Sequence, residues 1–269
     1  MEFSLSDLRL HRIEAEKLLS PRDATLESVR VKLNIALLAV GATLCFALHA
    51  SQEAVVAAVV AGLFVATIDA VGNRGLGEAL LLDTVGRLTS VSYANRVARH
   101  EAGHMLVAVM VGIAPRSYTL SVADALKRGM QAGFQAGTQF CSAAFEAEVK
   151  SGKLSAASLD SFCCVALAGV SAEYLTYGQA EGGLNDIQQL DSLLTALGFT
   201  QKRADSQVRW ALLSAVGLLR RHARAHDALT AAMSEGRSLG ACLEVLQSAL
   251  VGELSGERRD AVVVAGTSD

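Results

Sequence analysis

Two long apolar stretches with almost no charge follow one another near the N-terminus of the chain. Residues 33–50 contain no Lys, Arg, Asp or Glu, and after a short polar break residues 54–71 contain only Asp69. As α-helices, both would be about 27 Å long, close to the thickness of the hydrocarbon core of a bilayer. The pattern predicts a transmembrane helical hairpin over residues 33–71. A hairpin buried inside a soluble helical protein is the alternative.

Positive charges flank this predicted hairpin but are absent from its turn. Arg22, Arg30 and Lys32 precede it, and Arg74 and Arg87 follow it. Lys and Arg are enriched in the loops on the cytoplasmic side of membranes. The bias therefore places both flanks of the hairpin on the cytoplasmic or stromal side.

Downstream of the hairpin, apolar residues recur mostly at helical spacing. Residues 93–111 lack proline and carry Val97, Leu106, Val107 and Met110 at the intervals of a helix. Further helices are predicted over residues 156–177, 184–197, 204–224 and 239–250. The best strand candidates are residues 117–121 and 137–140. The predicted fold class is mainly α with a small β-sheet (α+β).

The same pattern divides the chain into five segments. We expect an N-terminal helical segment, the hairpin, a linker with a short surface helix, a compact domain and a disordered polar tail. Their bounds are residues 1–32, 33–71, 72–92, 93–252 and 253–269.

The strongest chemical signal lies in the first helix of the predicted domain. Residues 100–104 read H-E-A-G-H, so His100 and His104 share one helix face and can bind one metal ion. Glu101 lies between them, where it can take a proton from water at that ion. This is the core of a zinc peptidase. A chance match on a buried helix is the alternative.

A catalytic zinc site needs a third protein ligand, and two carboxylates downstream are candidates. Asp186 follows glycines, so the backbone can turn sharply there and begin a new helix at Ile187. Glu173 lies in the middle of a predicted helix and reaches the metal only if that helix packs beside the first. Asp186 is favoured. For either residue, a helix cap or a surface charge is the ordinary role.

Three separated motifs of this chain resemble those of the FtsH family of membrane-anchored zinc proteases, peptidase family M41. That family carries H-E-A-G-H, then a helix reading A-G-x-x-A-E, then a glycine-rich turn ending in N-D or S-D. Here they are residues 100–104, 168–173 and 182–186. The resemblance covers about residues 93–225. It implies an M41-type helical peptidase domain, with His100, His104 and Asp186 as Zn²⁺ ligands and Glu101 as general base. Glu173 would orient a ligand histidine.

The chain departs from most of that family in lacking a G-x-x-x-x-G-K-[ST] phosphate loop. We therefore expect it not to unfold substrates by itself, and to work alone or beside a separate ATPase or an FtsH-type complex. Two apolar segments followed by the peptidase module resemble the ATPase-less M41-like proteins of plant and algal plastids. The resemblance implies a chloroplast membrane, thylakoid or envelope, with the peptidase domain on the stromal side.

Composition narrows the partners. The net charge of −3 gives no general signal for nucleic acid, and 51% of residues are hydrophobic, as suits membrane lipid as a partner. The five cysteines are an odd number without a C-x-x-C pair, which favours buried, reduced thiols.

Together these features predict a membrane-anchored, ATP-independent zinc metallopeptidase acting on accessible or damaged membrane polypeptides. One alternative is a catalytically silent assembly factor or chaperone on a protease scaffold. A soluble helical interaction protein is another, and it requires the hairpin to be buried.

Overall fold

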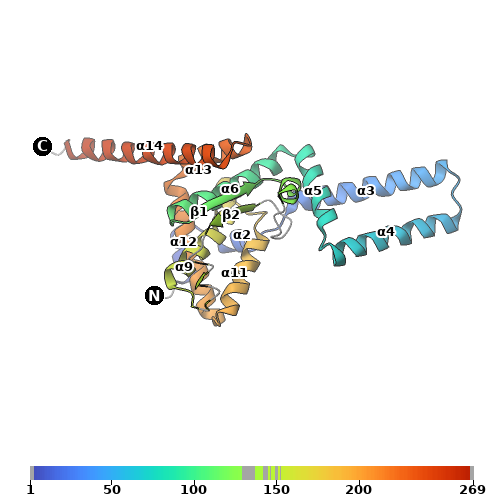
Figure 1. The fold of residues 1–269 in the computed structure, drawn as a ribbon, viewed down its shortest axis with the longest axis horizontal. Helices are drawn as coiled ribbons and strands as arrows, with labels where there is room; N and C mark the ends of the chain where they lie inside the picture. Colours follow the sequence, from blue (N-terminus) through green and yellow to red (C-terminus); the bar gives the residue numbers. More distant parts are fainter. Residues whose placement is uncertain are drawn as a thin grey trace. The chain divides into compact units, whose positions relative to one another are not determined.

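The computed structural model is mainly helical and contains one two-stranded antiparallel sheet, as the sequence predicts (Figure 1). It describes residues 3–128, 137–141, 145, 147–148, 151 and 153–266. The chain forms two compact units. The hairpin unit comprises Asp23–Ala94 and Ser121–Ala136, and the core unit comprises Met1–Arg22, Asn95–Leu120 and Gly137–Asp269.

The core unit is built from helices and one small sheet, and helical residues supply most of its buried core. Its helices include α1 (Leu5–Leu10), α2 (Ala15–Leu19), most of α6 (Val91–Met110), α9 (Ala156–Ala166), α10 (Ala168–Tyr177), α11 (Leu184–Ala196), α12 (Gln201–Arg221), α13 (Ala223–Ser234) and α14 (Leu239–Gly266). Strand β1 (Ala114–Thr119) pairs antiparallel with β2 (Gly137–Cys141), and the register shifts between Pro115 and Ser117. The ends of both strands lie within three residues of the ends predicted from the sequence, 117–121 and 137–140.

The N-terminal segment packs into the same core as the metal-motif helix. Leu8, Ile13 and Leu18 are buried in one cluster with Met105 and Leu106 of α6. The sequence predicts residues 1–32 as an element of their own, but the structure separates them at Arg22. The reason is the apolar stripe of α1 and α2, which needs a partner surface and finds it on the core unit.

Three helices of the core unit differ from their predicted bounds. The helix predicted over 156–177 is interrupted at Leu167, and the one predicted over 204–224 becomes α12 and α13. Helix α14 continues to Gly266, into the stretch predicted as a disordered tail, and residues 267–269 lie outside the described residues. That stretch has no proline and holds Glu, Arg and Ala, which are compatible with a helix.

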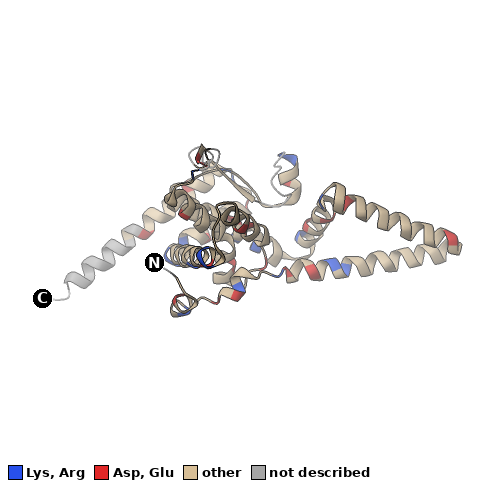
Figure 2. Cartoon of the chain, turned by 90° about the horizontal axis from the view of Figure 1, so that it is seen from below, with Lys and Arg blue, Asp and Glu red and all other residues tan. Residues whose placement is uncertain are grey.

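Two long antiparallel helices and two shorter ones lie in the described part of the hairpin unit. Helices α3 (Ala24–Ala47) and α4 (Gln52–Gly72) run antiparallel to one another on either side of a common turn (Figure 1). The described residues of the unit also include α5 (Leu76–Thr89) and α7 (Val122–Lys127). Figure 2 shows that charged residues lie near the ends of α3 and α4, with a long uncharged stretch between. Helix α3 begins at Ala24 because Asp23 caps it: the Asp23 side chain accepts a hydrogen bond from the Leu26 amide.

The base of the hairpin is fixed to α5 by buried and polar contacts. The Asp69 carboxylate near the end of α4 accepts hydrogen bonds from the backbone amides of Gly77 and Glu78 at the start of α5. Asp83 on α5 is buried and accepts from the Tyr93 hydroxyl and the Val122 amide. These bonds define the corner at which the hairpin ends.

Beyond this base, the hairpin leaves its apolar side chains exposed. Among the described residues, three helices are long and apolar enough to cross a membrane: Ala24–Ala47, Gln52–Gly72 and Ala156–Tyr177. More than half of the third is buried in the core unit, whereas almost nothing of the first two is buried. The described residues of this chain therefore do not bury the hairpin.

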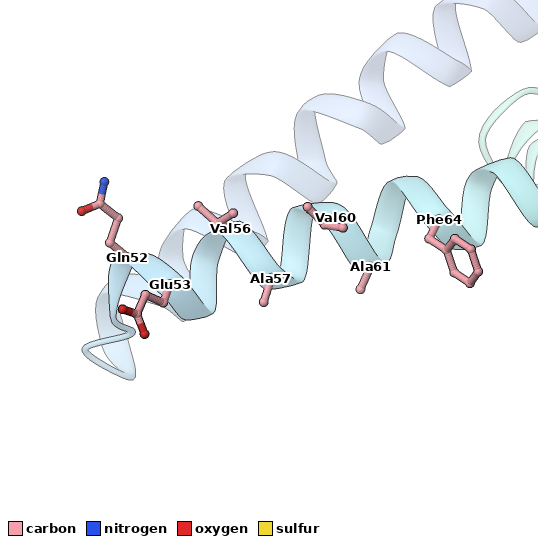
Figure 3. Close-up of a pocket in the computed structure, with 7 residues that line it drawn as sticks. All are labelled: Gln52, Glu53, Val56, Ala57, Val60, Ala61 and Phe64. Carbon is pink, nitrogen blue, oxygen red and sulfur yellow. The ribbon is translucent and has the colours of Figure 1, made fainter.

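A shallow hollow on α4 illustrates this exposed surface. It is lined by residues of α4 alone, with Gln52 and Glu53 at the turn and only apolar side chains after them, ending at Phe64 (Figure 3). A large apolar side chain that stays in water lacks the roughly 1.5–3 kcal/mol of free energy that its burial would contribute. A surface of this composition favours contact with lipid or with another apolar helix.

Candidate metal centre

Helix α6 brings His100 and His104 together on its buried face. The two residues are four positions apart, so their rings point in the same direction, and their centroids are 4.7 Å apart. Both are among the buried polar residues of the core unit, as is Glu101. Burying three polar side chains is costly unless each has a partner. Their partners define the site.

Three side-chain atoms from two helices converge at this face. His100 Nε2 lies 3.0 Å from His104 Nε2 and 3.0 Å from Asp186 Oδ2, and His104 Nε2 lies 3.4 Å from Asp186 Oδ2. Within the described residues, this is the one group of three or more His, Cys, Asp or Glu side chains that could hold a metal ion. In tetrahedral zinc sites the ligand atoms lie about 3.3 Å apart. The separations therefore fit zinc.

The outer nitrogens of both rings determine what faces the cluster. His104 Nδ1 donates to the Val165 carbonyl at 2.7 Å, and His100 Nδ1 donates to Glu173 Oε1 at 2.8 Å. A carbonyl or a carboxylate only accepts, so the neutral rings carry their protons on Nδ1. Both Nε2 lone pairs then point toward Asp186. Such close acceptors repel one another unless a cation lies between them, and this chemistry fits a metal ion.

Two glycines allow α6 and α10 to approach closely enough for this arrangement. A Cβ at Gly103 would lie 2.7 Å from the Ala172 Cβ and 3.0 Å from the Ala168 carbonyl oxygen. A Cβ at Gly169 would lie 2.3 Å from His100 Nε2. The two helices therefore meet backbone to backbone, which puts Glu173 of α10 within reach of His100.

Glu173 lies behind His100 rather than among the converging atoms. Its side chain is 2% exposed, and it accepts from His100 and from the backbone amides of Glu181 and Gly182. Those amides belong to the turn that leads to Asp186. The structure thus gives Glu173 the position of an orienting residue and places Asp186, the other carboxylate considered from the sequence, at the cluster.

The glycine turn sets the position of Asp186. Gly183 precedes α11 with φ +87°, a conformation that favours glycine, and a Cβ there would lie 2.4 Å from Val170 Cγ1. Asp186 then lies in the first turn of α11, where a negative charge is favoured by the helix dipole. Its side chain is 27% exposed, against 9% and 8% for the two histidines, so the cluster meets solvent on the Asp186 side.

Glu101 points into the same region and receives a hydrogen bond from the sheet. The Thr138 hydroxyl on β2 donates to Glu101 Oε2 at 2.9 Å. Burial raises the pKa of Glu101, and the charges of His104 and His100 oppose this only in part. A carboxylate with a raised pKa accepts a proton more readily, which suits a general base.

The cluster attracts positive charge. Burial alone would lower the pKa of His100, but the protonated ring can donate hydrogen bonds to both Asp186 and Glu173, and these bonds raise its pKa well above the ordinary value. Burial alone would raise the pKa of Asp186, but the two histidines hold it far below its usual range. The raised pKa of His100 and the lowered pKa of Asp186 both describe a site that binds one positive charge tightly, whether a proton or a metal ion.

The chain was compared with models of known protein families and with curated proteins, and neither comparison found a match. The chemical interpretation of the cluster therefore depends on its own residues and geometry.

Three partners of the cluster have no sequence-based prediction: Val165, Thr138 and Arg96. The Val165 carbonyl binds His104 next to the interruption of the helix at Leu167, which the sequence does not mark. Thr138 lies on a predicted strand, but nothing in the sequence relates that strand to Glu101. Arg96 could have been found, because it lies four residues before His100 and so on the same helix face.

Proposed function

We propose that this chain is a membrane-anchored zinc metallopeptidase that hydrolyses accessible or damaged polypeptides. These 269 residues carry no phosphate loop, so the cleavage we propose needs no nucleotide bound to them. The motif order that resembles the FtsH family is consistent with this reaction. The main support for this proposal is that His100 Nε2, His104 Nε2 and Asp186 Oδ2 lie within 3.4 Å of one another.

Three protein ligands are what a catalytic zinc site uses, because the fourth position must remain open. Zinc, when bound there, supplies a Lewis acid that polarises a carbonyl group and lowers the pKa of water. His100 and His104 would hold it through Nε2 and Asp186 through Oδ2. Glu173 and the Val165 carbonyl would keep both rings in the correct tautomer.

Glu101 would perform the proton transfers. It takes a proton from the attacking water and returns it to the leaving amine, so that it ends each cycle ionised. The Thr138 hydroxyl keeps the carboxylate oriented during both steps. Because Thr138 belongs to β2, a strand lies directly beside the reacting groups. An extended polypeptide can pair with such a strand through its backbone, without a required side-chain sequence.

The exposed apolar hairpin supports anchoring in a membrane. Helices α3 and α4 are each long enough to cross one, and charged residues lie near their ends. The positive flanks would place the core unit on the cytoplasmic side, or on the stromal side of a chloroplast membrane. The plastid location depends only on the resemblance to ATPase-less M41-like proteins. A separate ATPase or an FtsH-type complex is the partner that this resemblance suggests.

Chelation tests the zinc requirement. We expect the purified full chain to contain one zinc ion and to cleave an unfolded substrate such as casein. A chelator should abolish cleavage, zinc should restore it, and Mg²⁺ should not, because imidazole ligands suit zinc and magnesium prefers oxygen. A protein that binds zinc without cleaving any unfolded substrate would instead be the silent assembly factor. A well-folded protein that binds no zinc would contradict the proposal.

Alkaline carbonate extraction tests the anchor. The full chain, expressed in cells, should stay in the membrane pellet, because two apolar helices in hydrocarbon are not released by high pH. Detergent should release it, which serves as the control for aggregation. Recovery in the soluble fraction after carbonate treatment would show that the hairpin does not span the bilayer.

A further inference from the structure

Arg96 lies on α6, one helical turn before His100, and on the same face as both histidines. Its side chain is 15% exposed, and each of its two terminal nitrogens has a carboxylate partner. Arg96 Nη1 donates to Glu173 Oε2 and to the Gln179 carbonyl, both at 3.2 Å, and Nη2 lies 3.1 Å from Glu181 Oε1. The guanidinium also lies over the Tyr177 ring, 4.1 Å from its centroid.

These contacts join two parts of the metal centre that come from different elements. Glu173 is the carboxylate that holds the outer nitrogen of His100. Gln179 and Glu181 belong to the turn between α10 and α11, and two of its backbone amides also bind Glu173. Asp186 follows this turn by a few residues. One side chain therefore contacts both the residue that orients one ligand and the segment that carries another.

Glu173 also explains why a cation is needed at this point. Its carboxylate is almost fully buried and accepts hydrogen bonds from His100 and from two backbone amides. When His100 holds a metal ion through Nε2 its ring is neutral, and the amides are neutral as well. A buried carboxylate without an opposite charge is costly. Arg96 supplies that charge, and its planar fork binds Glu173 and Glu181 in a fixed geometry that a lysine cannot reproduce.

We propose that Arg96 is a positioning residue that sets the zinc affinity of the site by fixing Glu173 and the 179–183 turn together. It touches neither the metal ligands nor the reacting atoms, so it acts through Glu173 on His100 and through the turn on Asp186. This inference rests on the proposed function in so far as the His100, His104 and Asp186 cluster binds zinc.

Zinc titration of the full chain in detergent, in competition with a chelator of known affinity, tests the inference. Arg96→Ala should weaken zinc binding by about tenfold, the lower end of the range found when a partner of a metal-ligating histidine is removed, because Arg96 acts on His100 through its partner Glu173. Arg96→Lys should recover part of this loss, because it restores the charge without the fork. Glu181→Gln should give a smaller loss, because the bond between Arg96 and Glu173 remains.

Arg99→Ala is the matched control. Arg99 lies on the same helix, three residues later, and pairs with Asp227, whose side chain is 61% exposed. Its removal should leave the zinc affinity within about twofold of the wild type. The thermal midpoint of each metal-free variant is measured in parallel, because a merely structural role for Arg96 would lower that midpoint and leave the zinc affinity of the folded protein unchanged.

The outcomes separate this inference from the proposed function. If the wild type binds no zinc, the proposed function fails with it. If the wild type binds zinc and Arg96→Ala binds it equally well, the inference about Arg96 fails alone. Should Arg96→Ala not fold, the zinc affinities of Arg96→Lys and Glu181→Gln test the inference instead. Wild-type zinc affinity in both variants would overturn it.

Discussion

Replacing Glu101 with glutamine should abolish peptide cleavage while zinc remains bound. Glutamine has nearly the same size and can still accept the hydrogen bond from Thr138, so the buried surroundings of the side chain are preserved. It cannot accept a proton at neutral pH, and loss of a general base costs about 10²–10⁴-fold in rate. Initial rates on an unfolded substrate, measured together with zinc content, check this expectation.

The control for this substitution is Glu244→Gln. Glu244 lies exposed on α14 of the same unit, so its replacement removes one negative charge without touching the cluster. Its rate should equal that of the wild type. If Glu101→Gln cleaves as fast as the wild type, the activity comes from a contaminant or from another base. Loss of zinc in this variant would mean that Glu101 holds the metal.

Replacing Asp186 with asparagine should remove most of the zinc affinity. The substitution keeps the shape of the side chain but takes away the negative charge that faces both Nε2 atoms. Removing a partner behind a ligand typically costs 10–100-fold in metal affinity. Loss of a ligand charge should cost at least about a hundredfold. Competition with a chelator of known affinity, carried out on the full chain, measures the zinc affinity of the variant against that of the wild type.

Asp191→Asn serves as the control, because Asp191 lies exposed on the same helix one and a half turns later. It should bind zinc like the wild type. Glu173→Gln completes the comparison and should show a loss smaller than that of Asp186→Asn. The opposite order, with zinc retained in Asp186→Asn and lost in Glu173→Gln, would assign the third ligand to Glu173.

The parts of the fold that follow from local sequence were predictable. The hairpin follows from two apolar stretches with almost no charge, and α6 follows from the spacing of apolar residues such as Val107 and Met110. His100 and His104 face the same way because four residues are close to one helical turn. Their convergence is a local property of α6, so it needed no knowledge of tertiary structure.

The parts that depend on tertiary packing were not predictable in the same way. The sequence left Asp186 and Glu173 as alternatives, because either could reach the histidines depending on how the helices pack. Only the close approach at Gly103 and Gly169 puts Glu173 on the outer nitrogen of His100. A glycine in a helix indicates that something approaches closely, but it does not say what approaches.

The N-terminal segment gives a second example of this limit. Leu8 and Leu18 show an apolar stripe in the sequence, which indicates that the segment needs a partner surface. The stripe does not indicate which surface that is. Leu8 and Leu18 are buried in one core cluster with residues of α6, α10 and α12, far from them in sequence, and such long-range packing leaves no periodic pattern.

The turn between α3 and α4 has a consequence for how such a protein would sense its surroundings. Only residues 48–51 separate the two helices. In a bilayer crossed by both helices, this turn and the first residues of α4, Gln52 and Glu53, would be what these 269 residues present to the far compartment, with one imidazole and no lysine. Impermeant lysine-directed labels and proteases added to the far compartment should therefore find almost no target among these residues, whereas the same reagents added on the near side should find many.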